Sequence, residues 1–287
     1  MNKLPSLLIR EMLKEELAFA AECTAAEGWV SEDRTTLEGF FIKDPKGCLL
    51  AVDKGQPVGI CVATFYGNTG FIGELIVRLE ARGKGVGAEL LKHGMRILKD
   101  RGAETIYLDG VVRAVELYER NGFHKVCRSW RFSGHLAGKP SLHVRRMVIR
   151  DLDQVSAIDK LSFGADRSFF LRRRLELFPE LSHVMIDSER IIGYIFGRDG
   201  QNWVSAGPWV VKEDAKNPVD LLSALALDAG DRPISIGILE TNHQACDMVR
   251  RLGFKERSDS PWRMASDRSN NLGASPSCYA VGSAAKG

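Results

Sequence analysis

The chain has 287 residues, of which 44% are hydrophobic and 27% charged, and its net charge is +3. This composition is that of a folded protein long enough for two domains, and so small a charge gives little support to a nucleic-acid partner. No apolar run is long enough to span a bilayer, and residues 1–5 lack the apolar core of a signal peptide. We therefore expect no membrane partner and a cytoplasmic location.

Six cysteines and six histidines are scattered along the chain. The cysteines include no Cys-x-x-Cys pair, which indicates reduced side chains in a cytosolic protein. The histidines show no metal-ligand spacing, so no metal is expected.

The predicted elements run in the same order twice. Each half starts with a strand and two helical segments, followed by three strands, a helix, a strand, a helix and a strand. The matching segments are 9–11 with 149–151, 57–60 with 191–194, 73–77 with 207–211, and 108–126 with 239–256. Self-similarity over so long a period indicates a diverged duplication.

In the first half, the segment 82–87 (RGKGVG) lies between an apolar strand at 71–77 and a helix at 88–99. Glycines let successive N–H groups point inward, and the helix start adds partial positive charge to the full charges of Arg82 and Lys84. This combination predicts a site for a pyrophosphate. It does not match the Gly-x-x-x-x-Gly-Lys-Ser/Thr pattern of a Walker loop.

A dinucleotide-binding fingerprint is one interpretation of this segment. Gly83-x-Gly85-x-x-Ala88 fits Gly-x-Gly-x-x-Gly/Ala, and Asp109 ends the next strand, where a ribose-binding acid would lie. However, residues 78–82 separate the strand from the glycines, and no second mononucleotide-binding half follows. Both features count against a nicotinamide enzyme.

The same segment resembles motif A of the GNAT acyl-CoA transferases, Arg/Gln-x-x-Gly-x-Gly/Ala. Residues 117–123 (LYERNGF) resemble that family's Leu-Tyr-x-x-x-Gly-Phe motif, in the family's order and at about its spacing. The resemblance implies acetyl-CoA as the acyl donor and an α+β fold of two tandem GNAT-like domains, each a mostly antiparallel twisted sheet flanked by helices. The cofactor-binding residues that it implies are Leu75, Ile76, Val77, Arg82, Gly83, Lys84, Gly85, Val86, Gly87 and Ala88.

The resemblance also implies how the chemistry is shared. The strand at 71–77 is expected to splay from its neighbour near a bulge and to bind the pantetheine arm through its backbone. Tyr118 is the candidate general acid for the departing thiolate, the alternative being a packing role. Glu74 is the candidate base, because it is charged within an apolar strand; the alternative is a carboxylate paired with an arginine across the sheet. Period-two alternation puts Glu74 on the face opposite Leu75 and Val77.

Four residues are acceptor-pocket candidates: Asp109, Arg113, Asp166 and Arg167. Asp109 is the second choice for the base. Many family members have an asparagine about seven residues before the motif's tyrosine, where this chain has Val111. Arg113, close by, is expected to reach either the cofactor's phosphates or an anionic acceptor.

The second half lacks the features of the phosphate loop. The glycine segment aligns with residues 216–220, which contain no glycine, and Pro218 there removes one N–H from the helix start. Tyr118 aligns with Val249. One acyl-CoA site per chain is therefore expected, although the second half could bind a ligand by other means.

The arrangement resembles the tandem GNAT group, in which an ordinary transferase domain precedes a divergent one. Residues 163–167 (FGADR) resemble that group's Phe-Gly-x-Asp-Arg segment, and residues 277–282 resemble its last strand after an irregular loop at 267–274. Asp166 and Arg167 would select the charge of the acceptor, whereas residues 172–174 are interpreted as a solvated helix face.

These observations divide the chain into a catalytic domain at 1–134, a polar linker at 135–142 and a divergent domain at 143–287. The predicted activity is direct transfer of an acetyl group from acetyl-CoA to the amine of a small metabolite in a ternary complex. A protein lysine or N-terminal amine acetyltransferase is one alternative, and a non-catalytic acyl-CoA sensor is another. A monomer or a homodimer is expected.

Overall fold

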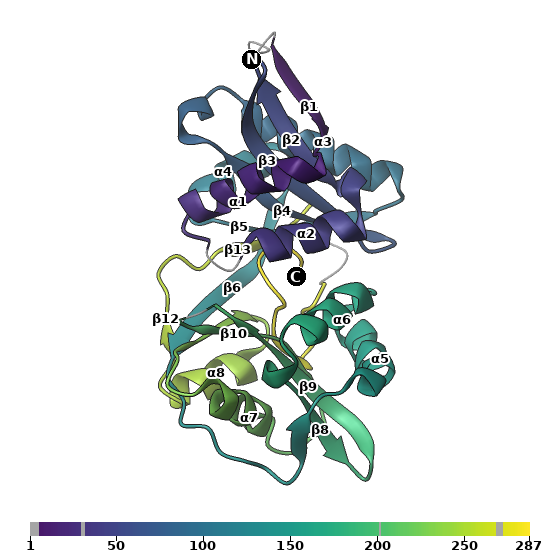
Figure 1. The fold of residues 1–287 in the computed structure, drawn as a ribbon, viewed down its shortest axis with the longest axis vertical. Coiled ribbons are helices and arrows are strands. Elements are labelled where there is room, and N and C mark those ends of the chain that lie inside the picture. Colours follow the sequence, from purple (N-terminus) through teal and green to yellow (C-terminus); the bar gives the residue numbers. More distant parts are fainter. Residues whose placement is uncertain (1–5, 30–31, 201, 268–271) are drawn as a thin grey trace.

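The computed structural model describes residues 6–29, 32–200, 202–267 and 272–287, which form two stacked lobes (Figure 1). The first half contains β1 (Leu7–Glu11), α1 (Leu17–Ala26), α2 (Arg34–Lys43), β2 (Cys48–Asp53), β3 (Gln56–Phe65), β4 (Thr69–Val77), α3 (Val86–Asp100), β5 (Thr105–Gly110), α4 (Val115–Arg120) and β6 (His124–Gly134). The predicted order of elements in this half is confirmed.

The second half repeats this order. It contains β7 (Val144–Arg146), α5 (Leu152–Phe163), α6 (Ser168–Leu177), β8 (Ser182–Asp187), β9 (Arg190–Asp199), β10 (Val204–Val211), α7 (Val219–Ala229), β11 (Ile234–Leu239), α8 (His243–Arg251), β12 (Lys255–Glu256), β13 (Trp262–Ala265) and β14 (Cys278–Ala280). The last strand, β14, lies where the tandem resemblance predicts one. Of the irregular loop expected before it, residues 268–271 lie outside the described residues.

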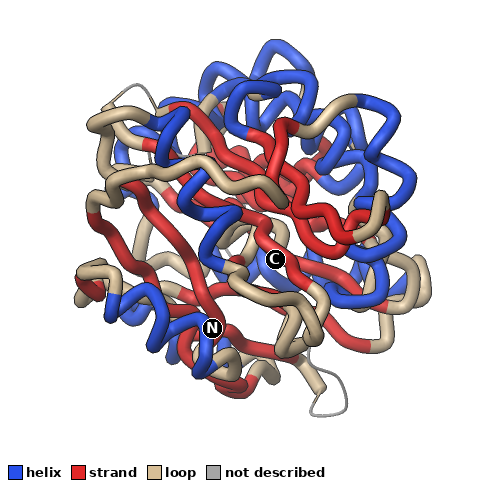
Figure 2. Tube along the Cα trace, turned by 90° about the horizontal axis from the view of Figure 1, so that it is seen from below, coloured by secondary structure: helices blue, strands red, loops and turns tan. Residues whose placement is uncertain are grey.

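The strands join into one large sheet, in the order β1-β2-β3-β4-β5-β13-β6-β11-β10-β9-β8-β7. Within the described chain, β4 with β5 and β10 with β11 are the parallel pairs, and the other pairs are antiparallel. Seen from below, helices lie around the outside of the strands (Figure 2). This is the α+β fold of two mostly antiparallel, helix-flanked sheets that the sequence predicts.

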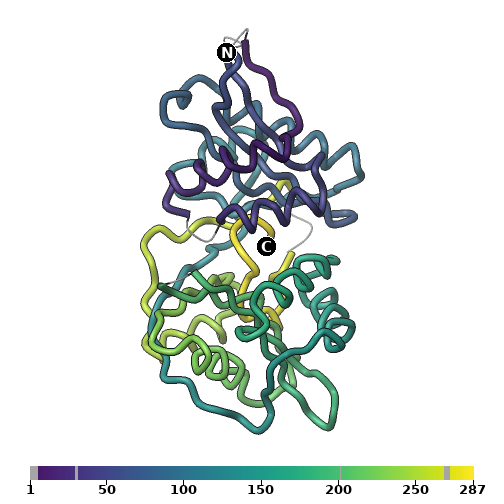
Figure 3. The backbone as a smooth tube through the Cα atoms, in the orientation of Figure 1, coloured from purple at the N-terminus to yellow at the C-terminus, as the bar shows by residue number. Residues whose placement is uncertain are grey.

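The two halves exchange strands where they meet. Strand β13, from the second half, lies between β5 and β6 in the first lobe. The start of β6 pairs with β13, but its residues 129–134 pair with β11 in the second lobe. The proposed boundary at residue 134 therefore divides the sequence, whereas the sheets share strands across it (Figure 3).

The hydrophobic core also crosses between the lobes. In the first lobe, α3 covers one face of the sheet with Leu90, Leu91 and Leu98 fully buried. The opposite face packs against α1 and α2, and this cluster includes Phe163 and Phe170 of the second half. The shared cluster holds the two lobes in a fixed relation, so residues from both can form one site.

Residues 135–142 contain no helix or strand, as expected of a linker, but they pack against α7. A Cβ atom on Gly138 would lie 2.1 Å from the backbone nitrogen of Leu227, so the chain passes α7 too closely for a side chain. All six cysteines are buried and form no disulfide. In the described ranges, no helix is long and apolar enough to cross a membrane.

Candidate active site

Strand β4 carries a bulge and then separates from β5. It pairs with β3 beyond the bulge, but with β5 only as far as Ile72. Ile60 of β3 faces Ile76, whereas Val62 faces Gly73, so β4 has one extra residue here. Glu74 lies at the bulge with a positive φ of 48°. The expected splay and bulge are confirmed, and they leave the edge of β4 from residue 73 onward open toward β5.

Glu74 is buried in the wall of a cavity between the lobes, with 3% of its surface exposed. Leu75 lines the same cavity and, like Val77, packs against the core cluster that α3 covers. Burial and the neighbouring Glu32 raise the pKa of Glu74 well above its usual value, although Lys286 and Arg198 act in the opposite sense. A raised pKa makes the ionised carboxylate a stronger proton acceptor than an ordinary glutamate.

Tyr118 lines the same cavity and is 7% exposed. Its ring meets Phe123 edge-on, with the ring centroids 6.2 Å apart, and lies against Gly110, where a Cβ atom would be 2.8 Å from the ring. Burial raises the pKa of Tyr118 well above its usual value, so the hydroxyl keeps its proton. The cavity thus contains a potential proton acceptor and a potential proton donor.

The glycine segment forms an open cradle at the start of α3. Gly83 and Gly85 have positive φ values of 75° and 89°, and Gly85 is the N-cap residue of the helix. Among the described residues, the N–H groups from 85 to 88 have no hydrogen-bond partner. A Cβ atom on either glycine would meet nothing within 4 Å. Unpaired donors at a helix start, facing open space, fit a pyrophosphate.

The basic residues beside this cradle come from two segments. Arg82 donates from Nε to the carbonyl of Val77 at 2.8 Å, and both Arg82 and Arg113 form ion pairs with Glu27. Lys84 donates to the carbonyl of Glu80 at 2.8 Å. Arg113 does not line the cavity between the lobes. Arg113 shares Glu27 with Arg82 as its ion-pair partner, which favours the alternative prediction that Arg113 lies near the phosphates of the cofactor.

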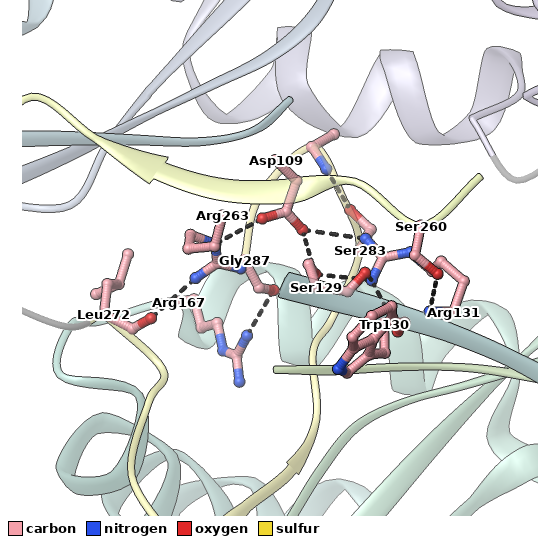
Figure 4. Close-up of polar contacts among 11 residues, drawn as sticks. Asp109, Ser129, Trp130, Arg131, Arg167, Ser260, Arg263, Leu272, Ser283 and Gly287 are labelled. Carbon is pink, nitrogen blue, oxygen red and sulfur yellow. Dashed lines mark hydrogen bonds and ion pairs between the residues drawn. The ribbon is translucent and has the colours of Figure 1, made fainter. Parts of the chain in front are cut away.

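Asp109 lines the cavity but is fully engaged (Figure 4). It accepts from Arg263 Nε at 2.6 Å, Arg131 Nη2 at 3.0 Å and Ser129 Oγ at 2.9 Å. Burial alone would raise the pKa of Asp109, but the two guanidinium groups outweigh it and hold the pKa below its usual value. Asp109 is therefore an anion that joins β5 to β6 and β13, which makes it unsuitable as a base or a ribose ligand.

Asp166 and Arg167, which the sequence predicts in the acceptor pocket, do not line this cavity. Asp166 is exposed and accepts from the backbone N–H of Ser168 at 2.9 Å. Arg167 is 4% exposed, pairs with Asp159 at 2.8 Å, and donates to the carbonyl of Gly287 at 2.9 Å (Figure 4). Its role is to hold the C-terminal segment in place.

The cavity has a volume of about 470 Å³, and residues of both lobes line it. Sequence reasoning missed three of its charged residues: Arg174 on α6, Arg198 on β9 and Lys286 near the C-terminus. The interpretation of residues 172–174 as a solvated face is correct for Arg172 alone. Arg173 reaches the carbonyl of Thr35 at 3.1 Å, and Arg174 lines the cavity. No local pattern distinguishes these three arginines.

Residues 281–287, here called the C-terminal segment, run between the two lobes (Figure 3). Residues 281–286 line the cavity. Tyr66 donates to the carbonyl of Lys286 at 3.1 Å. A Cβ atom on Gly73 would lie 2.4 Å from the carbonyl oxygen of Ala285, so glycine is required where this segment crosses β4.

Comparison with known families identifies the family to which the chain belongs. The profile of the "Acetyltransferase (GNAT) family" matches residues 10–123, and that of an "Acetyltransferase (GNAT) domain" matches residues 155–280. The chain belongs to the GNAT acetyltransferase family. The two matches, here called the first and second GNAT domains, confirm the tandem organisation and an acetyltransferase relationship.

Named relatives match parts of this GNAT protein. Mycothiol acetyltransferase from Stackebrandtia nassauensis is 39% identical over 106 residues, which are 33% of this chain and 34% of that protein. N-alpha-acetyltransferase 30 from Schizosaccharomyces pombe is 31% identical over 102 residues, 32% of this chain and 68% of that protein. The chain therefore matches only about a third of the length of the mycothiol acetyltransferase.

Solved structures match almost the whole chain. A putative acetyltransferase from Pyrococcus horikoshii has a TM-score of 0.83 and 22% identity, and the match covers 100% of this chain and 98% of that one. A tandem GNAT protein from the clavulanic acid biosynthesis pathway has a TM-score of 0.62 and 13% identity, with 92% and 100% covered. At these identities the likeness shows the fold alone.

The second GNAT domain fills the gap that the first leaves open. Strand β10 pairs with β11 only over residues 204–206, as β4 does with β5. Here, however, β14 pairs with β10, with Val210 opposite Cys278, and Val281 donates to the carbonyl of Gly237 in β11 at 2.8 Å. The protein's own chain thus occupies the position that a pantetheine arm would need.

The described residues include no group of three or more histidine, cysteine or acidic side chains placed to hold a metal ion. The side chains of the cavity wall that could transfer a proton include Glu74 and Tyr118.

Proposed function

We propose that this GNAT protein transfers an acetyl group from acetyl-CoA directly to the amine of a small metabolite, at one site per chain in the first GNAT domain. The observation that carries the proposal is that Glu74 and Tyr118 line the same cavity, at the open edge of β4. The cradle at Gly83 and Gly85 supplies unpaired N–H groups for the cofactor's pyrophosphate.

In the proposed reaction, Glu74 accepts a proton from the acceptor's ammonium group. The nitrogen lone pair then bonds to the acetyl carbon, the carbon–sulfur bond breaks, and the Tyr118 hydroxyl protonates the thiolate. The second proton that the nitrogen loses as it becomes an amide returns to the Tyr118 oxygen through solvent. A backbone N–H among residues 75–77 polarises the thioester carbonyl, and one such donor is usually worth about 3 kcal/mol of the barrier. Holding both reactants together supplies about 7–11 kcal/mol, so positioning is the larger contribution.

The walls of the cavity support a small acceptor. Residues of β4 and β5 in the first GNAT domain line it, and so do Arg174 and Arg198 of the second GNAT domain and the C-terminal segment. A pocket bounded by two domains suits a metabolite, whereas a protein substrate needs an open groove. The second candidate is a protein N-terminal amine, which the partial similarity to N-alpha-acetyltransferases favours.

The test is an acetylation assay with the full chain, acetyl-CoA and two sets of acceptors. One set contains small amines, and the other contains peptides with a free N-terminus or a lysine. We expect release of CoA with small amines only. Release with peptides only would replace the proposal with the second candidate.

Tyr118→Phe separates an enzyme from a non-catalytic sensor. A general acid contributes about 10²–10⁴-fold to the rate, so kcat should fall by that order while the affinity for acetyl-CoA stays the same. Binding of acetyl-CoA without turnover of any acceptor by the unaltered protein would support the sensor instead.

A further inference from the structure

Arg174 is a half-buried cation in the cavity wall. Among the described residues its side chain forms no ion pair, and its Nη1 atom is buried without a hydrogen-bond partner. Its neighbours on α6 differ, since Arg172 is exposed and Arg173 bonds to the first GNAT domain. A charged nitrogen that is buried without a hydrogen-bond partner destabilises a protein, which suggests that a ligand supplies the missing acceptor for Arg174 Nη1.

A second guanidinium increases this cost. Arg198 lines the same cavity and pairs with Asp33 at 2.8 Å. Burial and the charge of Arg198 lower the pKa of Arg174 to about 10, although Glu32 and Asp33 act in the opposite sense. Asp33 pairs with Arg198, and no ion pair links Arg174 to a carboxylate in the described ranges, so an anion in the cavity would offset the charge of Arg174.

The other charges in the cavity wall are largely matched. Arg131 pairs with Asp109 at 3.0 Å, and Arg257 pairs with Asp259 at 2.6 Å. Lys286 of the C-terminal segment also lines the cavity, and burial lowers its pKa to about 8. In the described ranges, the cavity cations that form no ion pair with a carboxylate are thus Arg174 and Lys286, and neither belongs to the cluster around Asp109.

We propose that the acceptor is an amine that also carries an anionic group, a carboxylate or a phosphate, which binds to Arg174 beside Arg198 while its amine faces Glu74. This proposal rests on the proposed function, because it names the acceptor of that site. Guanidinium groups bind both anions through paired N–H donors. A cavity of about 470 Å³ is within the usual range for a small ligand. The second GNAT domain would then set the specificity of the first.

Anion binding is tested without relying on catalysis. The full chain, Arg174→Met and the matched control Arg172→Met are titrated with succinate, inorganic phosphate and neutral succinamide, with CoA present to occupy the cradle. We expect binding of an anion, but not of succinamide, by the unaltered protein and by Arg172→Met. Arg174→Met should bind at least tenfold more weakly, a difference of about 1.4 kcal/mol.

Equal anion affinity in all three proteins, or no binding of either anion, would overturn the proposal. A preference for succinate or for phosphate identifies which anionic group the site recognises. Circular dichroism and thermal unfolding of both variants confirm that they are folded.

A second assay compares amino acids with their amides, and phosphoethanolamine with ethanolamine, as acceptors. The unaltered protein should favour the anionic member by at least tenfold in kcat/KM. Arg174→Met should lose that preference, whereas the control Arg172→Met should keep it. Turnover with no preference overturns the inference alone. If no amine is acetylated, the proposed function fails, and the anion titration then decides the inference.

Discussion

Glu74→Gln removes the proposed base while keeping its shape and volume. The side chain is 3% exposed at the bulge of β4, so the amide fills the same space. We expect kcat to fall by about 10²–10⁴-fold, which is about 3–5 kcal/mol in the barrier. The contribution from positioning is separate, so a residual rate should remain measurable.

The same substitution changes how the rate depends on pH. Burial and Glu32 raise the pKa of Glu74, with Lys286 and Arg198 opposing them. Only the ionised carboxylate accepts a proton, so the rate of the unaltered protein should rise with pH through this raised pKa. Glu74→Gln cannot ionise and should lack that limb of the profile.

Stability should change with pH in the opposite direction. Below the pKa of Glu74 in the unfolded chain, both states hold the proton. Above it, the unfolded chain loses the proton while the folded protein retains it, so stability falls as pH rises until the raised pKa is passed. Glu74→Gln cannot ionise at this position, so its stability does not fall in this way. Above the raised pKa of Glu74, the variant should be more stable than the unaltered protein.

The assay combines pH–rate profiles with urea unfolding at about pH 5 and about pH 8. Glu116→Gln is the matched control, because that side chain is 75% exposed and lies outside the cavity. A kcat for Glu74→Gln within twofold of the unaltered protein would refute the role of Glu74 as a base. So would an unchanged pH–rate limb.

Two further substitutions test how the lobes are held together. Gly73→Ala should lower the free energy of unfolding by about 1–3 kcal/mol, measured by calorimetry, because its Cβ atom would lie 2.4 Å from the carbonyl oxygen of Ala285. Unchanged unfolding would mean that the C-terminal segment does not pack there. Arg167→Met should cost about 3–5 kcal/mol in urea unfolding, because it leaves the buried carboxylate of Asp159 without its cation. A loss no larger than that of the exposed control Arg172→Met would contradict this.

The sequence was sufficient to predict the elements that depend on local patterns. Apolar strands, turn residues and helix periodicity recur in both halves, so the order of elements followed from self-comparison. The glycine cradle was also predictable, because Gly83 and Gly85 adopt positive φ values that few other residues tolerate. Tyr118 was found through its motif and does line the cavity.

Features that depend on distant partners were not predictable. Nothing in residues 262–265 shows that β13 pairs with β5 of the other half. The exact position of the bulge at Glu74 was not predictable either, because a bulge depends on the register between β3 and β4 and not on the strand's own sequence. Arg174 and Arg172 look alike in sequence, and only the packing of α6 against the first lobe separates them.

A calorimetric titration of the full chain with acetyl-CoA is the decisive measurement of where and how often the cofactor binds. Gly85→Ala is compared with Gly102→Ala, since both glycines have positive φ, 89° and 96°, and open space around the Cβ position. The backbone strain is thus similar, but only Gly85 lies in the cradle. We expect one acetyl-CoA per chain, kept in Gly102→Ala and weakened at least tenfold in Gly85→Ala. Two per chain, no binding, or equal effects of the two substitutions would contradict a single cofactor site in the first GNAT domain.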